Sequence, residues 1–488
     1  MDLQRISRGL KATFGARVLY MAASGLLTVV LTRFLLTNEQ FGLVGSAVAV
    51  LGVARLFGDL GLAKSAARYV TEYREKDPSQ VPHVLRTAVV LRLVAIGAVC
   101  GAFAVFGGDI ARLIDQPELA PLLVVGAGYI AANSFFTFSQ VLFQGYNRVT
   151  YSATIQATGA VLRLVMAVVF VALLGGAVGA MVGYVVGYGI AAVFGLALLY
   201  AKCYRGTERA DSPEEGLSRR IAEYSVPLTA TRGANVLDKR VDTILVGYFM
   251  TPVAVSYYYL AKQVVGFVQT PAASLGFTLS PTYGEEKAGG ETERAARIYE
   301  TSLRHTLLLY VPAAAGMVLV AEPAIRLVFG EGYAGAAPVL QVFAVYVVLQ
   351  AITFITSDAL DFLGRARSRA YAKGTASVGN FLLNLVLIPA FGVAGAAAAT
   401  VVTHTGYVAV NVAIIHSELS LPLGRVLRHF AATVGVACVM SVAVYLALTA
   451  ASGPLAVVAA VPLGVVVWAA VSVASGLVDP RQVASVLS

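Results

Sequence analysis

The sequence has little charge and few residues of the kinds that build catalytic or metal sites. Only 13% of its 488 residues are charged, whereas a soluble domain of average composition is about a quarter charged. A soluble fold cannot easily hide the apolar surface, because 58% of the residues are hydrophobic. An ordinary soluble enzyme is therefore nearly excluded. Disorder is excluded as well, since a disordered chain combines low hydrophobicity with high charge.

Cysteine is scarce, and the common catalytic motifs are missing. The three cysteines, Cys100, Cys203 and Cys438, stand far apart without a Cys-x-x-Cys pair, which argues against a disulfide framework and a structural zinc site. The sequence has no His-Glu-x-x-His, Gly-x-Ser-x-Gly, Walker A or Asp-x-Asp motif. Its loops are too short to hold a catalytic domain. We therefore expect a protein that is not an enzyme and that has no cofactor of its own, unless Na+ or H+ couples its activity.

Long apolar runs are the dominant feature that is present. The mean hydropathy is +0.76, and a helix needs roughly 20 apolar residues to cross a bilayer. The sequence therefore predicts an all-α polytopic membrane protein with about 14 transmembrane helices. Charged, glycine or proline breaks delimit the predicted spans, which are 14–36, 41–62, 84–106, 121–143, 151–173, 178–200, 225–249, 254–280, 305–328, 337–359, 370–389, 392–415, 430–449 and 455–476.

The basic residues divide unequally between the two sides of this topology. With the N-terminus inside, the termini and loops on the cytoplasmic side carry 25 Lys and Arg, whereas the outer loops carry 2. Basic residues accumulate in cytoplasmic loops, so we expect a multi-pass protein of the cell membrane with both termini in the cytoplasm. The net charge of +9 is then mostly a topological signal, and no nucleic-acid partner is expected. The first span has no cleavage site and is predicted to remain uncleaved.

Two segments of the chain repeat at nearly the same distance. Leu35 to Ala47 aligns with Phe249 to Ala261 at an offset of 214, while Gly176 matches Gly392 and Gly179 matches Gly395 at an offset of 216. The implied unit has six spans. We therefore predict two pseudo-symmetric six-helix lobes, 1–205 and 206–418, followed by two C-terminal spans in 419–488. An even number of spans makes the repeat parallel, which suits alternating access.

Three stretches resemble a known superfamily. "NFLLNLVLIPAFGVAGAAAAT" (Asn380 to Thr400) resembles the span 11–12 hairpin of the multidrug/oligosaccharidyl-lipid/polysaccharide exporters. "FGEGYAGAAPVLQVFAV" (Phe329 to Val345) is similar to the start of their span 10, and Tyr224 to Met250 is similar to their span 7. The chain looks most like the polysaccharide-transport branch, the Wzx-type flippases.

That resemblance implies a transporter of an oligosaccharide linked to a polyprenyl or dolichyl (pyro)phosphate. The substrate would pass from the inner to the outer leaflet for surface polysaccharide or glycoprotein synthesis, with membrane lipid and a polysaccharide polymerase or glycosyltransferases as partners. Three alternatives stay open: a lipid II-type flippase, a cation-coupled multidrug extruder, and a membrane scaffold of a polysaccharide assembly complex. Extruders of cationic drugs need apolar or acidic cavities, so an excess of cations argues against the second.

Charged residues inside the predicted spans are the first candidates for a site, because each costs about 2.5–3.5 kcal/mol on insertion scales. Nine are basic: Arg17, Arg33, Arg55, Arg92, Arg163, Arg232, Lys239, Arg240 and Lys262. Four are acidic: Asp59, Asp238, Asp242 and Asp358. The cations cannot all be paired with these acids, which predicts an anion-binding cavity. Arginine suits a phosphate because its planar fork binds two oxygens at once.

Six of the charged residues are the predicted substrate-binding set of this cavity, namely Arg17, Arg55, Asp59, Arg163, Arg240 and Lys262. Arg55 and Asp59 are four residues apart, so a simple intrahelical ion pair is the alternative. Arg163 has no acid in its own helix. Arg17 and Lys262 lie where lipid II flippases, by resemblance, have functional cations. Arg33, Arg92 and Arg232 lie near span ends and are expected to snorkel to the interface.

Ion coupling is predicted from the resemblance to some lipid II flippases. Their Na+ site joins a span 7 Asp, an Asn-x-x-x-Asp pair and a Thr, and the matching residues here are Asp242 or Asp238, Asn380, Asn384 and Thr400. Asn384 replaces the carboxylate, which removes one negative charge. The alternatives are an ion-pair cluster within span 7 and asparagines that cross-link spans 11 and 12.

Two further features have a structural and a functional interpretation. Tyr257, Tyr258 and Tyr259 at the start of span 8 are typical of an aromatic belt at the membrane interface, and stacking on a sugar is the alternative. His404 in span 12 is expected to be a buried, hydrogen-bonded histidine, with a proton relay as the alternative.

Overall fold

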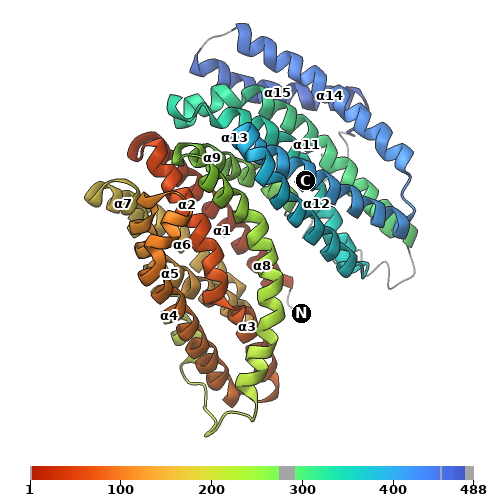
Figure 1. The fold of residues 1–488 in the computed structure, drawn as a ribbon. Helices are drawn as coiled ribbons and strands as arrows, with labels where there is room; N and C mark the ends of the chain where they lie inside the picture. The colour runs from red at the N-terminus through yellow and green to blue at the C-terminus, as the bar shows by residue number, and fades with distance from the viewer. Residues whose placement is uncertain (1–2, 274–291, 451–452, 479–488) are drawn as a thin grey trace. The chain divides into compact units, whose positions relative to one another are not determined.

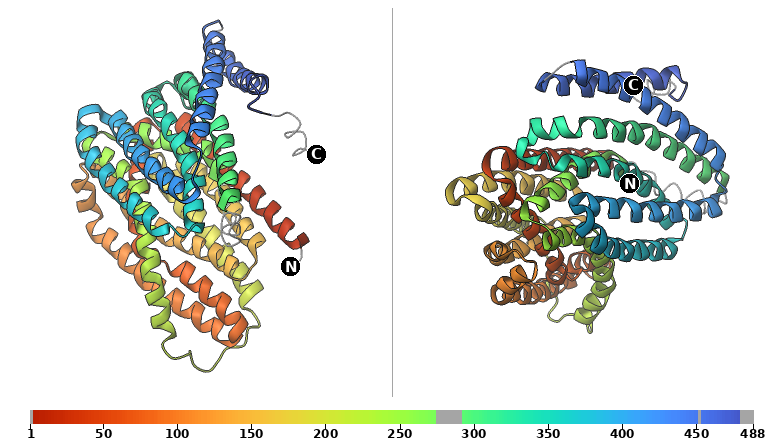
Figure 2. Two further views of the ribbon diagram at one scale, coloured as in Figure 1. Left: turned by 90° about the vertical axis from the view of Figure 1, so that its right-hand side faces the viewer. Right: turned by 45° about the horizontal axis from the view of Figure 1, so that its top comes forward.

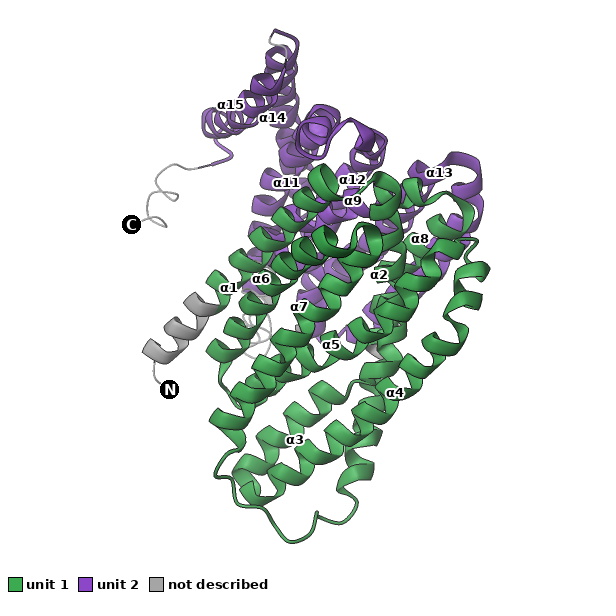
Figure 3. Ribbon diagram, turned by 90° about the vertical axis from the view of Figure 1, so that its left-hand side faces the viewer, with its two compact units in different colours: residues 1–256 green, residues 257–488 purple. Residues whose placement is uncertain are grey.

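The computed structural model describes residues 3–273, 292–450 and 453–478, and within these ranges the chain forms helices and short connections without a strand (Figure 1). It divides into two compact units, which are Met1–Ser256 (unit 1) and Tyr257–Ser488 (unit 2), coloured separately in Figure 3.

Unit 1 is built mainly from eight helices, and the ninth begins in it and continues into unit 2. Their bounds are α1 Leu3–Val30, α2 Asn38–Asp59, α3 Leu62–Lys76, α4 Val81–Leu113, α5 Ala120–Gly145, α6 Val149–Leu174, α7 Gly176–Leu199, α8 Leu217–Phe249 and α9 Pro252–Val268. Short π-helical turns, Leu31–Leu35 and Tyr200–Tyr204, extend α1 and α7.

The other helices of unit 2 in the described ranges are α11 to α15. Their bounds are α11 Thr292–Phe329, α12 Ala336–Phe362, α13 Ala366–Leu419, α14 Leu423–Ala450 and α15 Pro454–Ala474. α13 contains the predicted spans 11 and 12 in one helix of 54 residues, which is interrupted at Gly392 by a φ of 61°. A positive φ is open to glycine because it has no Cβ.

The chain is a polytopic helical membrane protein. Of the helices in the described ranges, 11 are long and apolar enough to cross a membrane, and both views of Figure 2 show the same all-helical architecture. The number 14 stays a prediction. It differs from 11 because α13 holds two predicted spans, and because α8 and α9 are not among the eleven.

α2 has well-defined ends that separate it from α3. At its start, the Gln40 amide donates to Thr37 Oγ1 and the Thr37 amide donates to Gln40 Oε1, both at 3.2 Å, which forms a capping box. At its end, Leu60 and Gly61 both have positive φ. A Cβ at Gly61 would lie 2.9 Å from the Ser225 carbonyl oxygen of α8, so glycine also permits the close approach of these helices.

α8 belongs to unit 1, although the sequence predicts it as the first span of the second lobe. Ser65 Oγ on α3 donates to the Ile221 carbonyl oxygen near the start of α8 at 2.9 Å. Near the other end, Gln116 Nε2 donates to the Gly247 carbonyl oxygen at 2.8 Å. The compact division therefore falls at 256/257, whereas the predicted lobes divide at 205/206. The lobes of the sequence repeat stay a prediction.

The segment before α8 is held against the turn between α3 and α4. The Ala210 amide donates to the Ser79 carbonyl oxygen at 3.0 Å, and His83 Nε2 lies 2.8 Å from the Ala210 carbonyl oxygen. Tyr73 donates a hydrogen bond to Glu214, which is the main cause of the lowered pKa of that carboxyl group. These contacts explain why α8 packs with the helices that precede it.

Matching contacts in the two units support the offset of 216. Gly176 and Gly392 both have positive φ. Three residues further along, a Cβ at Gly179 would lie 2.5 Å from the Phe170 carbonyl oxygen, and a Cβ at Gly395 would collide with the Leu387 carbonyl oxygen. Each unit therefore has a glycine-dependent helical hairpin at the corresponding position.

In unit 2, α14 packs on both α11 and α15. Arg425 pairs with the buried Glu300 at 3.1 Å, and His429 Nε2 lies 3.2 Å from the Arg304 carbonyl oxygen one turn further along. Trp468 Nε1 on α15 donates to the Leu308 carbonyl oxygen at 3.0 Å. Glu300, Arg304 and Leu308 follow one another at spacings of four residues, so both helices of the C-terminal hairpin are fixed to one face of α11.

Candidate functional site

Charged side chains from α2 and α4 meet in the interior of unit 1 around one carboxylate. Asp59 Oδ2 lies 3.5 Å from Arg55 Nε, and Asp59 Oδ1 lies 3.2 Å from Arg92 Nη1. Two consecutive residues of α5 complete the group: Arg55 donates to Asn133 Oδ1, and Arg92 donates to the Ser134 carbonyl oxygen at 2.6 Å. We call these five residues the Asp59 cluster. The intrahelical ion pair predicted for Arg55 and Asp59 is present, but as part of a larger network.

Arg92 contradicts its prediction. It was expected to snorkel to the interface, yet it is 0% exposed and its guanidinium lies 4.7 Å from the centre of the Phe138 ring. The reason is its partner: Asp59 is the sole acid in the first six predicted spans, and it attracts a cation from a neighbouring helix. The signal in the sequence was the lone acid among several cations, but sequence position did not show that Arg92 faces α2.

The three charged members of the Asp59 cluster differ in exposure. The side chain of Arg55 is 26% exposed, that of Asp59 is 5% exposed and that of Arg92 is 0% exposed. An anion can therefore reach Arg55, whereas Arg92 is enclosed. Asn133 was not among the predicted site residues. It is buried and accepts a hydrogen bond from Arg55, which orients the accessible guanidinium.

Arg163 lies in a second, aromatic environment between α6, α7 and α1. Nη2 donates to Ser24 Oγ at 2.7 Å and Nη1 donates to Tyr188 Oη at 3.0 Å. The guanidinium lies 5.7–5.8 Å from the ring centres of Tyr20, Tyr184 and Tyr188, within cation–π range. Within residues 3–273, no carboxylate forms an ion pair with Arg163. Hydroxyl groups and aromatic rings surround its guanidinium instead.

α8 adds further positive charge beside the Asp59 cluster. Arg240 packs across α2, where a Cβ at Gly52 would lie 3.2 Å from Arg240 Nε, one turn before Arg55. Arg232 is close enough to act electrostatically on Arg92. Arg232 is half-buried and not exposed as snorkelling would suggest, whereas Arg33 is exposed.

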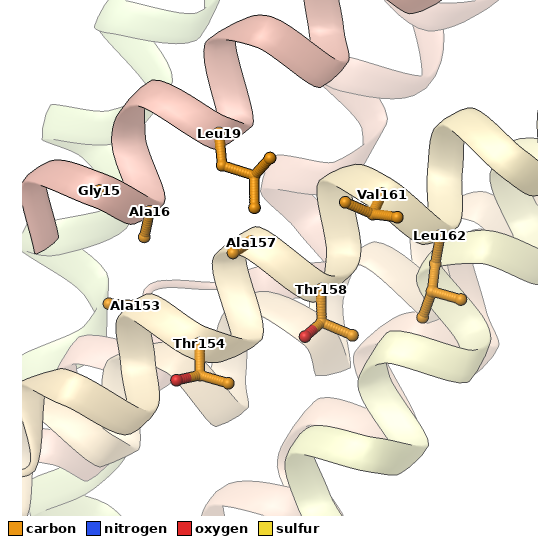
Figure 4. A pocket seen from close by; sticks show the side chains of 9 residues that line it. All are labelled: Gly15, Ala16, Leu19, Ala153, Thr154, Ala157, Thr158, Val161 and Leu162. Carbon is orange, nitrogen blue, oxygen red and sulfur yellow. The ribbon is translucent and has the colours of Figure 1, made fainter. Parts of the chain in front are cut away.

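Arg17 is exposed on α1 and is not part of the Asp59 cluster. Near it, α1 and α6 border a groove of about 560 Å³, shown in Figure 4. Small and neutral side chains line the groove, among them Gly15, Ala16, Ala153 and Ala157, and Leu19 points from α1 toward α6. Arg17 does not line it, so the structure gives no contact that supports its predicted role.

The residues predicted for ion coupling are divided between the units. In unit 2, Asn380 Nδ2 lies 3.5 Å from Thr400 Oγ1 and 3.4 Å from Thr403 Oγ1, while Asn384 Nδ2 donates to Asn380 Oδ1 at 3.0 Å. These bonds are the cross-linking that the sequence offered as the alternative.

Asp238 and Asp242 lie on α8 in unit 1, where Asp242 is 2% exposed. In the part of the chain that the structure describes, no group of three or more His, Cys, Asp or Glu residues is arranged to hold a metal ion. The coupling site therefore stays a prediction.

Lys262, Tyr258 and His404 of unit 2 contact neighbouring side chains of the same unit. Lys262 lies 5.1 Å from the centre of the Tyr258 ring. Tyr258 is fully buried and packs on Phe343 with the ring centres 5.5 Å apart. The prediction of an interface belt is therefore wrong for Tyr258, because span 8 turns this side chain toward α12. His404 is buried and hydrogen-bonded to Thr353 at 3.0 Å, as expected.

Unit 2 also contains an apolar pocket of about 470 Å³ between α9, α11, α12, α14 and α15. Its lining includes Pro312, Gly316, Met440, Gly464 and Trp468, and no charged side chain lines it. A pocket of this composition suits a hydrocarbon group.

Comparison with known proteins gives a consistent result. Residues 14–285, more than half of the chain, match the model of a family described as polysaccharide biosynthesis protein, and residues 228–406 match the MatE family model. A protein of Haloferax volcanii named "Probable low-salt glycan biosynthesis flippase Agl15" is 24% identical over 82% of this chain and 84% of its own length. The "Succinoglycan biosynthesis transport protein ExoT" of Rhizobium meliloti is 24% identical over 65% of this chain and 61% of its own length.

Two solved structures share the fold. A lipid II flippase MurJ in an inward closed conformation superposes with a TM-score of 0.77 and 16% identity, covering 95% of this chain and 97% of that protein. An inward-facing multidrug resistance transporter of the MATE family superposes with a TM-score of 0.69 and 16% identity, covering 82% of this chain and 94% of that protein. At this identity the likeness concerns the fold alone.

Proposed function

Since the chain belongs to the polysaccharide biosynthesis protein family, we propose that it is an alternating-access flippase for a lipid-linked oligosaccharide. It carries an oligosaccharide on a polyprenyl or dolichyl (pyro)phosphate from the inner to the outer leaflet of the cell membrane, and both of its termini lie in the cytoplasm. It is a transporter and not an enzyme. The relatives named as a glycan biosynthesis flippase and a succinoglycan transport protein support this proposal.

The observation that carries the proposal is the surplus of positive charge in unit 1. Of the nine cations and four acids named above as site candidates, unit 1 contains eight cations and three acids, whereas unit 2 contains Lys262 and Asp358. A surplus of cations within membrane spans is unfavourable unless an anion or water faces it. The phosphate of a lipid carrier is an anion that must cross the hydrophobic layer, and the surplus charge offsets its loss of hydration.

Arg55 and Arg163 have the strongest claim to the phosphate. Arg55 is the accessible member of the Asp59 cluster, and Arg163 has no carboxylate partner within residues 3–273. Both present planar donor groups of the kind that binds phosphate oxygens in pairs. Arg240, Lys262 and Arg17 belong to the predicted substrate-binding set with weaker support from contacts.

The apolar pocket of unit 2 fits the hydrocarbon part of the same substrate. Its lining has no charge, and glycine and alanine leave space beside the larger side chains. A prenyl chain gains roughly 0.8 kcal/mol for each CH2 group that it buries. We therefore propose that the pocket of unit 2, taken by itself, can bind a prenyl chain.

A cation-coupled drug extruder is the second candidate, because the MatE model matches residues 228–406. The charge of unit 1 opposes it, since a cationic drug would be repelled. Na+ or H+ coupling through Asp242 or Asp238, Asn380, Asn384 and Thr400 remains compatible with either function. Polysaccharide polymerases or glycosyltransferases are the expected protein partners of a flippase.

The test is the leaflet on which lipid-linked glycan accumulates. Cells that lack the protein are expected to accumulate it on the inner leaflet, and re-expression of the wild type restores surface glycan. Deletion that leaves surface glycan unchanged but abolishes efflux of cationic dyes would favour the extruder and contradict the flippase.

A further inference from the structure

We propose that Asp59 is the resting counter-ion of Arg55, and that Arg92 is the positioning residue that takes over this carboxylate when an anionic headgroup binds Arg55. The inference rests on the proposed function, because the anion is the (pyro)phosphate of the transported lipid. It assigns distinct roles to two side chains that the substrate does not need to touch.

The geometry shows a carboxylate shared by two cations. Asp59 lies 3.5 Å from Arg55 Nε through one oxygen and 3.2 Å from Arg92 Nη1 through the other. Both distances exceed the roughly 2.7–2.9 Å of a strong charge-assisted hydrogen bond. Neither arginine therefore holds Asp59 tightly, and a small movement of the carboxylate would favour one of them over the other.

Exposure decides which arginine can meet a ligand. Arg55 is 26% exposed at its side chain and Arg92 is 0% exposed. Arg92 is also fixed by the Ser134 carbonyl oxygen at 2.6 Å and by the Phe138 ring. Arg92 is thus confined to the protein interior, and its influence on a ligand must pass through Asp59.

Arg92 has the donors that this exchange requires. Its Nε and Nη2 atoms have no hydrogen-bond partner among the described residues, so Arg92 keeps unused donors for a carboxylate that leaves Arg55. A buried carboxylate without a partner is strongly unfavourable. Arg55 can therefore leave Asp59 for a phosphate because Arg92 retains it.

The sign of each effect follows from this competition. Asp59 competes with the phosphate for Arg55, which weakens binding and speeds release. Arg92 draws Asp59 away and so strengthens binding. Arg232 acts electrostatically on Arg92, and Arg240 packs on α2 beside Gly52, so α8 adds positive charge near the cluster. Substitutions at the two positions should therefore change affinity in opposite directions.

The experiment measures binding of geranylgeranyl pyrophosphate to the full-length protein in nanodiscs of neutral lipid, with geranylgeraniol as the uncharged control. We expect Asp59→Asn to bind the pyrophosphate about tenfold more tightly, although it lowers thermal stability, and Arg92→Met to bind it about tenfold more weakly. The double variant Asp59→Asn/Arg92→Met should regain the affinity of Asp59→Asn, because no carboxylate then competes. Arg92→Lys should be intermediate, and Arg33→Ala should match the wild type.

Each outcome decides between the two proposals. A wild type that binds pyrophosphate and alcohol equally would overturn the proposed function and this inference together. A wild type that prefers pyrophosphate and loses this preference in Arg55→Ala, combined with weaker or unchanged binding by Asp59→Asn, would overturn the inference alone. Equal losses in Arg92→Met and in the double variant would reduce Arg92 to a structural role. If Arg92→Met does not fold, the opposite shifts of Asp59→Asn and Arg92→Lys decide the matter.

Discussion

The two units share features of backbone architecture but differ in the chemistry of their interiors. Unit 1 holds eight of the nine cations named above as site candidates, whereas unit 2 holds Lys262. Unit 2 places Asn380, Asn384 and His404 in its interior, together with the apolar pocket. The hairpins of both units use glycines at matching positions, so this shared feature occurs both with and without the surplus of cations. The difference is the basis of our proposal that the charge of unit 1 binds a ligand.

One pair of contacting residues shows how the two units differ at corresponding positions. Gly187 on α7 packs against Arg163 on α6, where an added Cβ would lie 2.7 Å from Arg163 Cα. The positions 216 residues later are Thr403 and Gly379, and a Cβ at Gly379 would lie 3.7 Å from Thr403 Cγ2. Unit 1 thus has the large, charged residue where unit 2 has the glycine. The same helix crossing supports a cation in one unit and neutral contacts in the other.

The largest expected effect comes from removing Arg163, the cation of this pair. We expect Arg163→Ala to reduce transport of a lipid-linked oligosaccharide into proteoliposomes on the order of a hundredfold, because a hydrogen bond to a charged group contributes up to about 3 kcal/mol. Lys262→Ala in unit 2 should reduce it much less, and Arg33→Ala should be the silent control. A greater loss in Lys262→Ala than in Arg163→Ala would reverse the comparison.

Coupling is expected to depend on the carboxylate of α8. Asp242→Asn should slow turnover and decrease any stimulation by a Na+ or proton gradient about tenfold, in the range of typical coupling energies. The measurement is initial transport rate in proteoliposomes with each gradient imposed separately. Glu223→Gln, an exposed position on the same helix, is the control. Wild-type transport that ignores both gradients contradicts this prediction.

The glycine pair predicts opposite stability changes in the two units. Gly187→Ala forces a methyl group against the Arg163 backbone and should lower the free energy of unfolding by about 1–3 kcal/mol. Gly379→Ala meets only an ordinary contact and should raise it by about 0.5–1 kcal/mol through helix propensity. Thermal unfolding in detergent checks both. Equal destabilisation would show that the two crossings are packed alike.

The smallest effect is expected in the apolar pocket of unit 2. Gly316 faces this space, and a Cβ there would have one neighbour within 4 Å, Met440 Cε at 3.8 Å. Gly316→Leu should fill the pocket and weaken binding of a prenyl ligand about fourfold, the effect of losing roughly one buried methylene. Val466→Leu on the exposed face of α15 is the control. If Gly316→Leu leaves binding unaffected, the pocket does not bind the prenyl ligand.

Sequence patterns predicted what depends on one helix or on neighbouring helices. The spacing of four residues predicted the Arg55–Asp59 pair, and the alternative of asparagines that cross-link spans 11 and 12 predicted the contact between Asn380 and Thr400. The sequence did not predict contacts between helices that are distant along the chain, and Arg92 is the example. Its position along α4 follows from the sequence, but the helix face on which it meets α2 depends on tertiary packing. For the same reason, the sequence did not predict the burial of Tyr258 or the attachment of α8 to unit 1.

The central claim is that the surplus charge of unit 1 binds the phosphate of a lipid carrier. Its most direct test compares the affinity of the purified protein for geranylgeraniol, geranylgeranyl monophosphate and geranylgeranyl pyrophosphate. In the wild type, affinity should rise with headgroup charge. Lys262→Ala should keep most of this dependence. In the double variant Arg55→Ala/Arg163→Ala, affinity should become nearly independent of charge. Affinity that is independent of charge in the wild type, or that keeps its full dependence in the double variant, would contradict the claim.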